Sequence, residues 1–266
     1  MFKKFLILGV KISIINMDDA SFCIEDAILK RGKIYICVCP VSTIIECKKN
    51  LKVLSSVNSA DLATPDGMAV VWIGGMRGHK TIRRVYGPEL MQRICEISAK
   101  KGYRNYLFGS SQDVLEKLNV RLNKAYPGLS ISGSFSPPFR KLSKEEDDKI
   151  VSDINSSGSD IVWIGLGSPK QDLWMYEHRG RINAPVIVGV GAAFDFLAGT
   201  KLQAPSWIRN NGFEWLFRLI TEPRRLWRRY LLDYPAFVYY LLLDLISGVY
   251  SYFKSIIKAF AIKKRG

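Results

Sequence analysis

Apolar runs and amphipathic segments alternate along most of this chain. The short apolar runs, which are typical of buried strands, read KIYICVC, YRNYLFG, IVWIGLG and PVIVGVG. Between them lie segments with helical spacing, such as ELMQRICEISAKKG, where Leu90, Ile94 and Ile97 share one face and Gly102 ends the helix. This alternation predicts an α/β fold with a mainly parallel sheet covered by helices on both faces.

The remaining segments fit the same pattern. TIIECKKNLKVLSSV, DVLEKLNVRLNKAYPG and KEEDDKIVSDINSSG are predicted helices, and ADLATPDG is a short strand that runs into a loop. The start of the chain, MFKKFLILGVKISIINMDD, faintly resembles a signal peptide, but its apolar run is short and Lys11 interrupts it. We therefore expect a first strand or hairpin there, and a cytoplasmic protein.

The pattern changes after Pro223. Apolar residues then recur at positions that form one helical stripe, namely Ile246, Val249, Tyr250, Phe253, Ile256, Ile257 and Phe260, and the chain ends in KKRG. The sequence thus predicts a globular domain over residues 1–217 and a basic, amphipathic helical appendage over residues 218–266. An apolar stripe beside lysines is typical of a helix lying on a membrane surface, and a helix packed on the core or on another subunit is the alternative.

Charge and cysteine content narrow the function classes. Of the 266 residues 48% are hydrophobic, and the formal net charge of +15 indicates an anionic partner: nucleic acid, anionic lipid or a phosphorylated substrate. The five cysteines and two histidines do not have zinc-ligand spacing, which favours buried free thiols in a reducing compartment. No run of about 18 apolar residues predicts a membrane-spanning helix.

Ligands of parallel α/β sheets bind beyond the carboxyl ends of the strands, so the loops TPDG, FGSSQD, GLGSPKQ and GVGAAFDF carry the candidate residues. Asp66 in the first loop is a candidate general base, although Pro-Asp-Gly is also ordinary turn chemistry. Gln171 could offer its amide to a sugar or base, or lie at a helix surface. Glycines in these loops could admit a ligand to the backbone or allow tight packing: Gly109, Gly165, Gly167 and Gly191.

Arginines are concentrated near two of these segments. Arg83 and Arg84 precede VYGPEL, and EPRRLWRRY holds four arginines and one acid in nine residues. Planar guanidinium groups suit diphosphates, and such a cluster repels itself unless an anion binds. The chain has no Asp-x-Asp pair to hold a metal–nucleotide complex, which favours neutralisation by arginine and no metal or other cofactor. The acidic run Glu145 to Asp148 opens a helix, and the helix dipole explains it.

Six segments, in their order and spacing, resemble the WecG/TagA/CpsF glycosyltransferase family of bacterial cell-surface polymer synthesis. They are TPDGMAVVW, RVYGPEL, GLGSPKQ, GVGAAFDFLAG, APSW and GFEWLFRLITEPRRLWRRY. The resemblance extends from about Leu8 to Tyr230. It implies a Rossmann-like fold and inverting, metal-independent transfer from a UDP-sugar donor. The acceptor would be a sugar on a polyprenyl diphosphate, with the protein peripheral on the inner face of the cell membrane.

The resemblance also implies residue roles. Asp66 would deprotonate the acceptor hydroxyl, and five residues would bind the donor or its diphosphate: Arg84, Gln171, Arg218, Arg225 and Arg228. Many family members carry Thr-x-Asn after the strand at Cys37, where this chain reads Cys39-Pro-Val41-Ser-Thr43, so Thr43 is the candidate substitute. The chain also has Gln203 before Ala-Pro and Asp172 after Gln171, where arginine and glutamate are frequent in the family.

Two other classes fit part of the pattern. The net charge alone would permit a basic membrane- or nucleic-acid-binding protein without transferase activity, but the aromatic residues after Tyr234 follow an apolar stripe that suits lipid better than nucleic acid. A Rossmann-type oxidoreductase would carry G-x-G-x-x-G, which this chain lacks. The donor sugar, N-acetylmannosamine or another hexose, and the oligomeric state, a homo-oligomer included, stay open at this point.

Overall fold

The computed structural model describes residues 2–246, and within them the chain forms a six-stranded parallel sheet and a separate two-stranded hairpin. The strands of the large sheet lie in the order β4-β3-β8-β7-β5-β6. Their bounds are β3 Ile34–Cys39, β4 Leu62–Pro65, β5 Arg104–Gly109, β6 Ser130–Phe135, β7 Ile161–Gly165 and β8 Val186–Gly189.

The sheet is apolar on both faces because alternate residues of each strand point to opposite sides. On β3, Tyr35 and Cys37 pack into one hydrophobic cluster, whereas Ile36 packs into the other. On β7, Ile164 belongs to the first cluster and Trp163 to the second, and both are fully buried. Strands buried on both faces read as continuous apolar runs, which is the pattern seen in the sequence.

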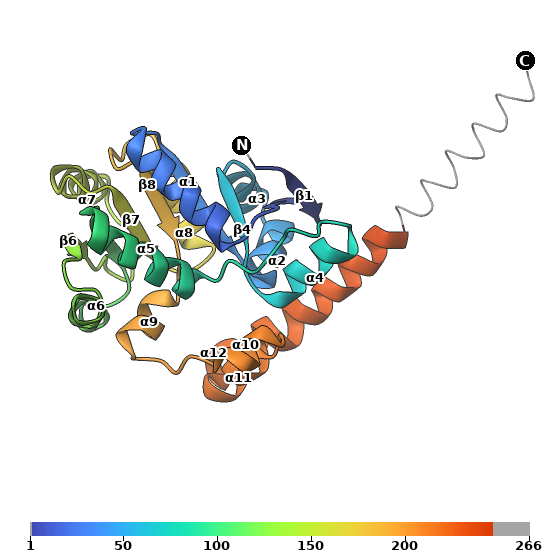
Figure 1. Cartoon of the computed structure of the whole chain (residues 1–266). Helices are drawn as coiled ribbons and strands as arrows, with labels where there is room; N and C mark the ends of the chain where they lie inside the picture. The colour runs from blue at the N-terminus through green and yellow to red at the C-terminus, as the bar shows by residue number, and fades with distance from the viewer. Residues whose placement is uncertain (1, 247–266) are drawn as a thin grey trace, which may run out of the picture.

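Helices cover both faces, as the sequence predicted (Figure 1). One cluster is completed by α1 Met17–Leu29, α5 Gly87–Lys101, α6 Gln112–Ala125 and α9 Ala193–Ala198. The other is completed by α2 Val41–Lys49, α3 Leu51–Asn58, α4 Met68–Met76, α7 Lys144–Ser156 and α8 Lys170–His178. The predicted α/β class with a mainly parallel sheet is therefore confirmed.

Two local predictions can be compared with the structure. The expected hairpin is present as β1 (Lys4–Ile7) and β2 (Val10–Ser13), which pair antiparallel around a turn at Leu8 and Gly9. The single helix expected over residues 43–57 is wrong, because the chain breaks at Asn50 into α2 and α3. Asn50 has an extended backbone (φ −138°), and its side chain caps α3 by accepting a hydrogen bond from the Lys52 N–H at 2.9 Å.

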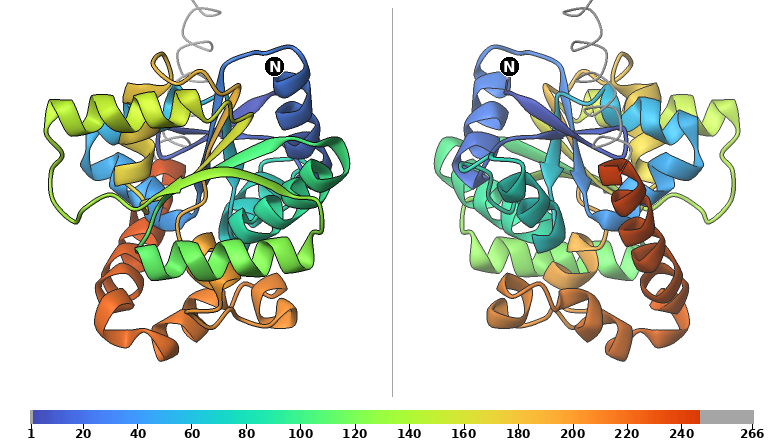
Figure 2. Two further views of the ribbon diagram at one scale, coloured as in Figure 1. Left: turned by 90° about the vertical axis from the view of Figure 1, so that its left-hand side faces the viewer. Right: turned by 90° about the vertical axis from the view of Figure 1, so that its right-hand side faces the viewer.

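The C-terminal segment forms a group of short helices at one end of the sheet (Figures 1 and 2). The group comprises α10 Ser206–Asn210, α11 Glu214–Thr221, α12 Pro223–Arg228 and the π-helical turn η1 Arg229–Asp233. Residues 234–246 continue as a helix that runs back along the sheet domain. Lys49 pairs with Asp233, the last residue of η1, at 2.6 Å, and Arg77 pairs with Asp244 of this helix at 3.2 Å. These ion pairs attach the segment to α2 and to the end of α4.

The predicted domain boundary between residues 217 and 218 falls inside α11. The division itself, and contact of the appendage with a membrane, stay predictions. The apolar stripe that begins at Ile246 lies, apart from that residue, outside the described residues. Within the described part of the chain, none of the helices has both the length and the apolar character needed to cross a bilayer.

Candidate active site

A cavity of about 580 Å³ lies at the carboxyl ends of the parallel strands. Its floor is made by residues that directly follow β3, β4, β7 and β8, including Pro40, Asp66, Leu166 and Val190. Its other wall comes from the C-terminal helices, which contribute both acidic and basic side chains. A cavity of this size, in which charged groups of both signs converge, is typical of a site for a small polar molecule.

Most of the predicted site residues line this cavity. They are Thr43, Asp66, Gly165, Gly167, Gln171, Gly191, Arg218 and Arg225. The structure places three others outside the lining: Arg84, Gly109 and Arg228. Loops that are far apart in sequence are thus brought together because parallel strands end at the same edge of the sheet.

Each of the three exceptions has a physical reason. Gly109 (φ +121°) lies so close to the neighbouring strand that a Cβ atom there would come within 2.6 Å of the carbonyl carbon of Gly165. Arg84 is buried behind the cavity wall, where its guanidinium pairs with Glu89 at 3.2 Å. Arg228 lies over the ring of Trp227 at 5.3 Å, and its neighbour Arg229 faces the cavity instead.

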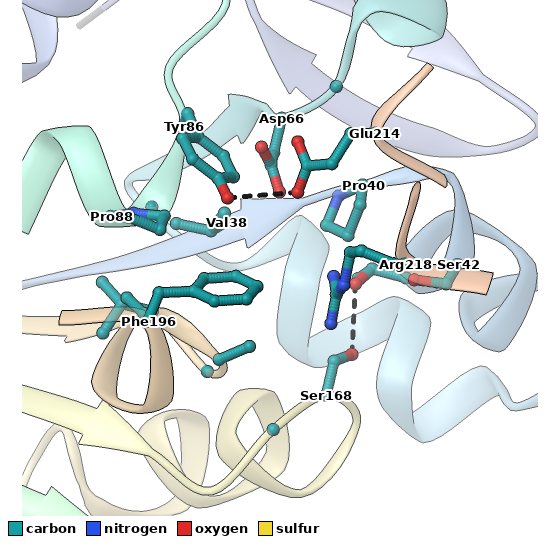
Figure 3. Close-up of a pocket in the computed structure, with 18 of the residues that line it drawn as sticks. Val38, Pro40, Ser42, Asp66, Tyr86, Pro88, Ser168, Phe196, Glu214 and Arg218 are labelled. Carbon is teal, nitrogen blue, oxygen red and sulfur yellow. Dashed lines mark hydrogen bonds between the residues drawn. The ribbon is translucent and has the colours of Figure 1, made fainter. Parts of the chain in front are cut away.

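Gln171 orders the glycine turn after β7. It is 3% exposed, so the interpretation of this residue as part of a helix surface is wrong. Its side-chain oxygen accepts a hydrogen bond from the Gly167 N–H at 3.1 Å, and Gly167 has a left-handed backbone (φ +78°) that favours glycine. Across the same turn, Thr43 donates a hydrogen bond to the hydroxyl of Ser168 at 3.1 Å; Figure 3 labels Ser168 in the cavity wall. On this side of the cavity, hydrogen bonds therefore hold the backbone of the glycine turn and the Gln171 amide in place before a ligand binds.

Asp66 is the acid best suited to proton transfer. It directly follows β4, is half-buried in the cavity lining and is followed by Gly67, whose φ of +88° turns the chain into α4. Burial raises the pKa of Asp66 to about 7, with Glu214 adding to the rise and Arg84 and Arg218 opposing it. A carboxyl group that titrates near neutral pH can accept a proton from a sugar hydroxyl as it reacts.

Glu214 is the carboxylate of the site that lies nearest to Asp66 in Figure 3; a third, Asp195, pairs with Lys201 at 3.0 Å. The hydroxyl of Tyr86 donates a hydrogen bond to Glu214 Oε1 at 3.1 Å. The amide of Gln203 in turn donates to the Tyr86 hydroxyl at 3.4 Å. Sequence reasoning missed Tyr86 and Glu214, although Glu214 lies four residues before Arg218 and so shares its helical face.

Basic side chains surround the remaining wall. Arg218 reaches into the cavity over the Phe196 ring at 5.3 Å; burial works against its charge, but Tyr230 and Glu214 raise the pKa of Arg218 above its ordinary value (Figure 3). Lys201, Arg209, Arg225 and Arg229 complete the basic lining. Burial lowers the pKa of Arg229, which is the response of a cation with too little counter-charge. Such a wall can bind a diphosphate.

Aromatic packing fixes the direction of α11. Trp215 contacts the rings of Tyr230 and Tyr234, with centroid separations of 6.2 and 6.1 Å, and the two tyrosines meet edge to face at 5.1 Å. All three residues line the cavity. This cluster ties α11 to η1 and to the helix that follows, so the side chains of Glu214 and Arg218 are held against the sheet domain.

Asp172 differs from its sequence neighbour Gln171 in that it points away from the cavity. It is fully buried, and burial raises the pKa of this carboxyl to about 6. Its surroundings include Ser168 and the thiol of Cys37, whose pKa is raised well above its ordinary value by burial. The five cysteines are free thiols; four of them are buried, as predicted, whereas Cys23 is half-buried.

Comparison with known proteins finds relatives that match most of the chain. The profile of the glycosyl transferase WecG/TagA/CpsF family matches residues 5–249. The chain is 31% identical over 193 residues to the N-acetylglucosaminyldiphosphoundecaprenol N-acetyl-beta-D-mannosaminyltransferase of Bacillus spizizenii, a match covering 73% of this chain and 72% of the relative. It is 28% identical over 186 residues to the enzyme of the same name in Staphylococcus aureus, with 70% of each chain covered.

Proposed function

The chain belongs to the WecG/TagA/CpsF family of glycosyltransferases, and on that premise we propose that it transfers an N-acetylmannosamine-type sugar from a UDP-sugar to N-acetylglucosamine carried on undecaprenyl diphosphate. The acceptor and the transferred sugar are taken from the names of the relatives in Bacillus spizizenii and Staphylococcus aureus. The observation that carries the proposal is Asp66, a carboxylate with a pKa near 7 in a cavity walled by arginines.

The reaction needs a base on the acceptor side of the cavity. In our proposal the Asp66 carboxylate takes the proton of the acceptor hydroxyl while the hydroxyl oxygen attacks the anomeric carbon of the donor. The bond between that carbon and the β-phosphate oxygen breaks, and UDP leaves with the electron pair. Attack from the face opposite UDP inverts the configuration, which agrees with the β-linkage in the names of the relatives. The proton on Asp66 is then lost to water.

The leaving diphosphate needs positive charge. Arg218 and Arg225 lie four and eleven residues after Glu214 on consecutive helices of the C-terminal segment, and both line the cavity. We assign them, with Arg229, to the diphosphate. Fixed guanidinium groups stabilise charge that develops as the bond breaks, without reorganisation at the moment of reaction. With this arrangement we propose that transfer needs no metal ion.

The acceptor lipid requires access from a membrane. Large apolar side chains are exposed on the C-terminal helices beside the arginines, including Trp207 (66% exposed), Phe213 (53%) and Ile220 (70%). Apolar residues flanked by cations are typical of contact with an anionic lipid surface. We propose that the protein binds peripherally to the inner face of the cell membrane through this segment.

The test is a transfer assay with a short-chain N-acetylglucosaminyl diphospholipid as the acceptor. UDP-N-acetylmannosamine, UDP-N-acetylglucosamine and UDP-glucose are compared as donors, with EDTA or with magnesium, and the products are identified by mass spectrometry. We expect a disaccharide lipid from UDP-N-acetylmannosamine, formed equally well with EDTA. Absence of transfer from every UDP donor would contradict the proposal. Transfer that requires magnesium would overturn its metal-free form alone.

A further inference from the structure

Helix α11 places an acidic and a basic side chain in the lining of the cavity. Glu214 and Arg218 are four residues apart on this helix, so they share a face, and both line the cavity. Figure 3 shows Glu214 beside Asp66, with Arg218 below them near Pro40. The arginine is explained by a diphosphate. The glutamate is not, because a second carboxylate repels that ligand.

The position of Glu214 is fixed by Tyr86. Burial raises the pKa of the Tyr86 phenol, so this hydroxyl keeps its proton and donates a hydrogen bond to Glu214 Oε1 at 3.1 Å. The same hydroxyl oxygen accepts a hydrogen bond from Gln203 at 3.4 Å, which leaves its own proton free to point at Glu214. The hydrogen bond therefore has one direction, and Glu214 is its acceptor.

The Tyr86 ring is itself clamped. The guanidinium groups of Arg84 and Arg209 lie 4.9 and 5.1 Å from the ring centroid, and both pair with Glu89, at 3.2 and 3.0 Å. These residues come from the loop before α5, from α5 and from α10. The position of Glu214 thus depends on the docking of the C-terminal helices against the sheet domain.

We propose that Glu214 is a positioning residue for the base: held by Tyr86, its negative charge beside the Asp66 carboxylate strengthens the affinity of Asp66 for the acceptor proton. The inference rests on the proposed function of Asp66. Its physical basis is repulsion between like charges, which is relieved when Asp66 takes up the proton, that is, as the acceptor reacts.

The other charges around Asp66 set the balance. Glu89 acts in the same direction as Glu214, whereas Arg84 and Arg218 act against it. Cys39, Tyr86 and Tyr234 also face Asp66 electrostatically and are neutral at the pH of interest, because burial raises the pKa of each. After burial, Glu214 is the largest contributor to the raised pKa of Asp66, so removing its charge lowers that pKa.

A direct titration tests this inference without relying on activity. The carboxyl ¹³C resonances of protein labelled at aspartate are followed against pH, and the Asp66→Asn variant identifies the Asp66 signal. In Glu214→Gln, which keeps the shape and can still accept from Tyr86, we expect the Asp66 midpoint to fall by roughly one pH unit, as expected for one charge at close range. In Glu214→Asp, which keeps the negative charge, we expect the Asp66 midpoint to stay close to that of the unmodified protein.

The matched control is Glu177→Gln, which removes one negative charge from an exposed position on α8 and leaves the midpoint unchanged. Glu214→Ala is the second charge-removing variant should the glutamine variant unfold. In active protein, the acidic limb of the kcat/KM profile moves with the midpoint, and the plateau falls because a weaker base accepts the acceptor proton less readily. An unmoved midpoint in Glu214→Gln overturns the inference and leaves transferase activity standing. Absence of transfer by the unmodified protein overturns the proposed function whatever the titration shows.

Discussion

The side-chain oxygen of Gln171 accepts a hydrogen bond from the backbone N–H of Gly167 at 3.1 Å, across the turn between β7 and α8. The amide group of Gln171 also lies against Gly189 and Gly191, so one buried side chain supports the two glycine turns that follow β7 and β8. Both turns form part of the cavity lining. The backbone presented to a ligand therefore depends on this glutamine.

Replacement of Gln171 by alanine tests that dependence. The variant leaves the half-buried Gly167 N–H without its acceptor, which costs about 1 kcal/mol of unfolding free energy. We expect a lower melting temperature and roughly tenfold weaker UDP binding, since a disordered turn must be reordered on binding. Chemical denaturation and calorimetric titration measure the two effects. Gln112→Ala on the exposed start of α6 is the control; equal effects in both variants would contradict the assignment.

Gly109 gives a prediction about packing. A Cβ at this position would lie 2.6 Å from the carbonyl carbon of Gly165, so Gly109→Ala forces β5 and β7 apart. We expect a loss of about 2–4 kcal/mol in unfolding free energy, from overpacking added to an unfavourable φ. Gly78→Ala is the matched control, because its φ of +86° is also left-handed but no atom lies within 4 Å of the added Cβ.

The control separates conformational strain from steric conflict. Gly78→Ala should cost only about 1–2 kcal/mol, the penalty of a left-handed backbone. If both variants lose the same stability in urea denaturation, close packing does not explain Gly109, and its predicted contact with substrate regains support. Sequence reasoning chose this glycine because it ends a strand. It could not distinguish a glycine required by a neighbouring strand from one required by a ligand.

The fold was predictable because its signals are local. The apolar runs at β3, β7 and β8 and the spacing of α5 follow from side chains that alternate between a sheet face and a helix face. The candidate loops followed from the same logic, since parallel strands end at one edge. Asp66, Gln171 and Gly191 could be proposed on that basis, and all three line the cavity.

The rest of the site depends on how the C-terminal helices dock, which the sequence does not display. Tyr86 and Glu214 meet only because α11 packs against the loop before α5. Helical phase also decides which of the neighbouring arginines line the cavity. Arg225 and Arg229 are four residues apart and share a face, whereas Arg228, at the junction of α12 with the π-helical turn η1, faces Trp227.

The arginines provide a third prediction. Arg218→Ala should weaken UDP binding roughly 10- to 100-fold, because charge-assisted bonds to the diphosphate are lost. Arg228→Ala removes the same charge from the same segment but outside the cavity lining, and we expect less than about a twofold change. Calorimetric titration with UDP in EDTA measures both. Equal losses would show that net charge, and not the placement of Arg218, governs binding.

The fourth prediction concerns Asp66 in the reaction. Only the ionised carboxylate accepts a proton, so with a pKa of about 7, kcat/KM should fall about tenfold per pH unit below 7 and level off above it. Asp66→Asn should lower the rate about 10²- to 10⁴-fold at pH 8. Its affinity for UDP should remain or increase, because a negative charge leaves the cavity. A variant that keeps its rate, or a profile flat between pH 5 and 8, would rule out this base.

The fifth prediction is that the ionised carboxylate of Asp66 lowers the stability of the folded protein. The pKa of Asp66 in the folded protein, about 7, lies above its ordinary value of 3.8, so the folded state binds the proton more tightly than the unfolded state. Stability therefore declines as pH rises from about 4 to 7, and the cost of the ionised carboxylate is fully present above pH 7. Asp66→Asn removes this cost.

We expect Asp66→Asn to gain about 1–2 kcal/mol in unfolding free energy at pH 8, a figure reduced for partial solvent screening, and nothing at pH 4. Urea denaturation of the two proteins across this range measures the difference, and Asp172, whose pKa is also raised by burial, contributes equally to both. If Asp66→Asn is inactive and is more stable only at high pH, the Asp66 carboxylate is needed for sugar transfer and not for folding. A gain that is independent of pH would instead indicate improved packing, and a loss would mean that the carboxylate stabilises the cavity.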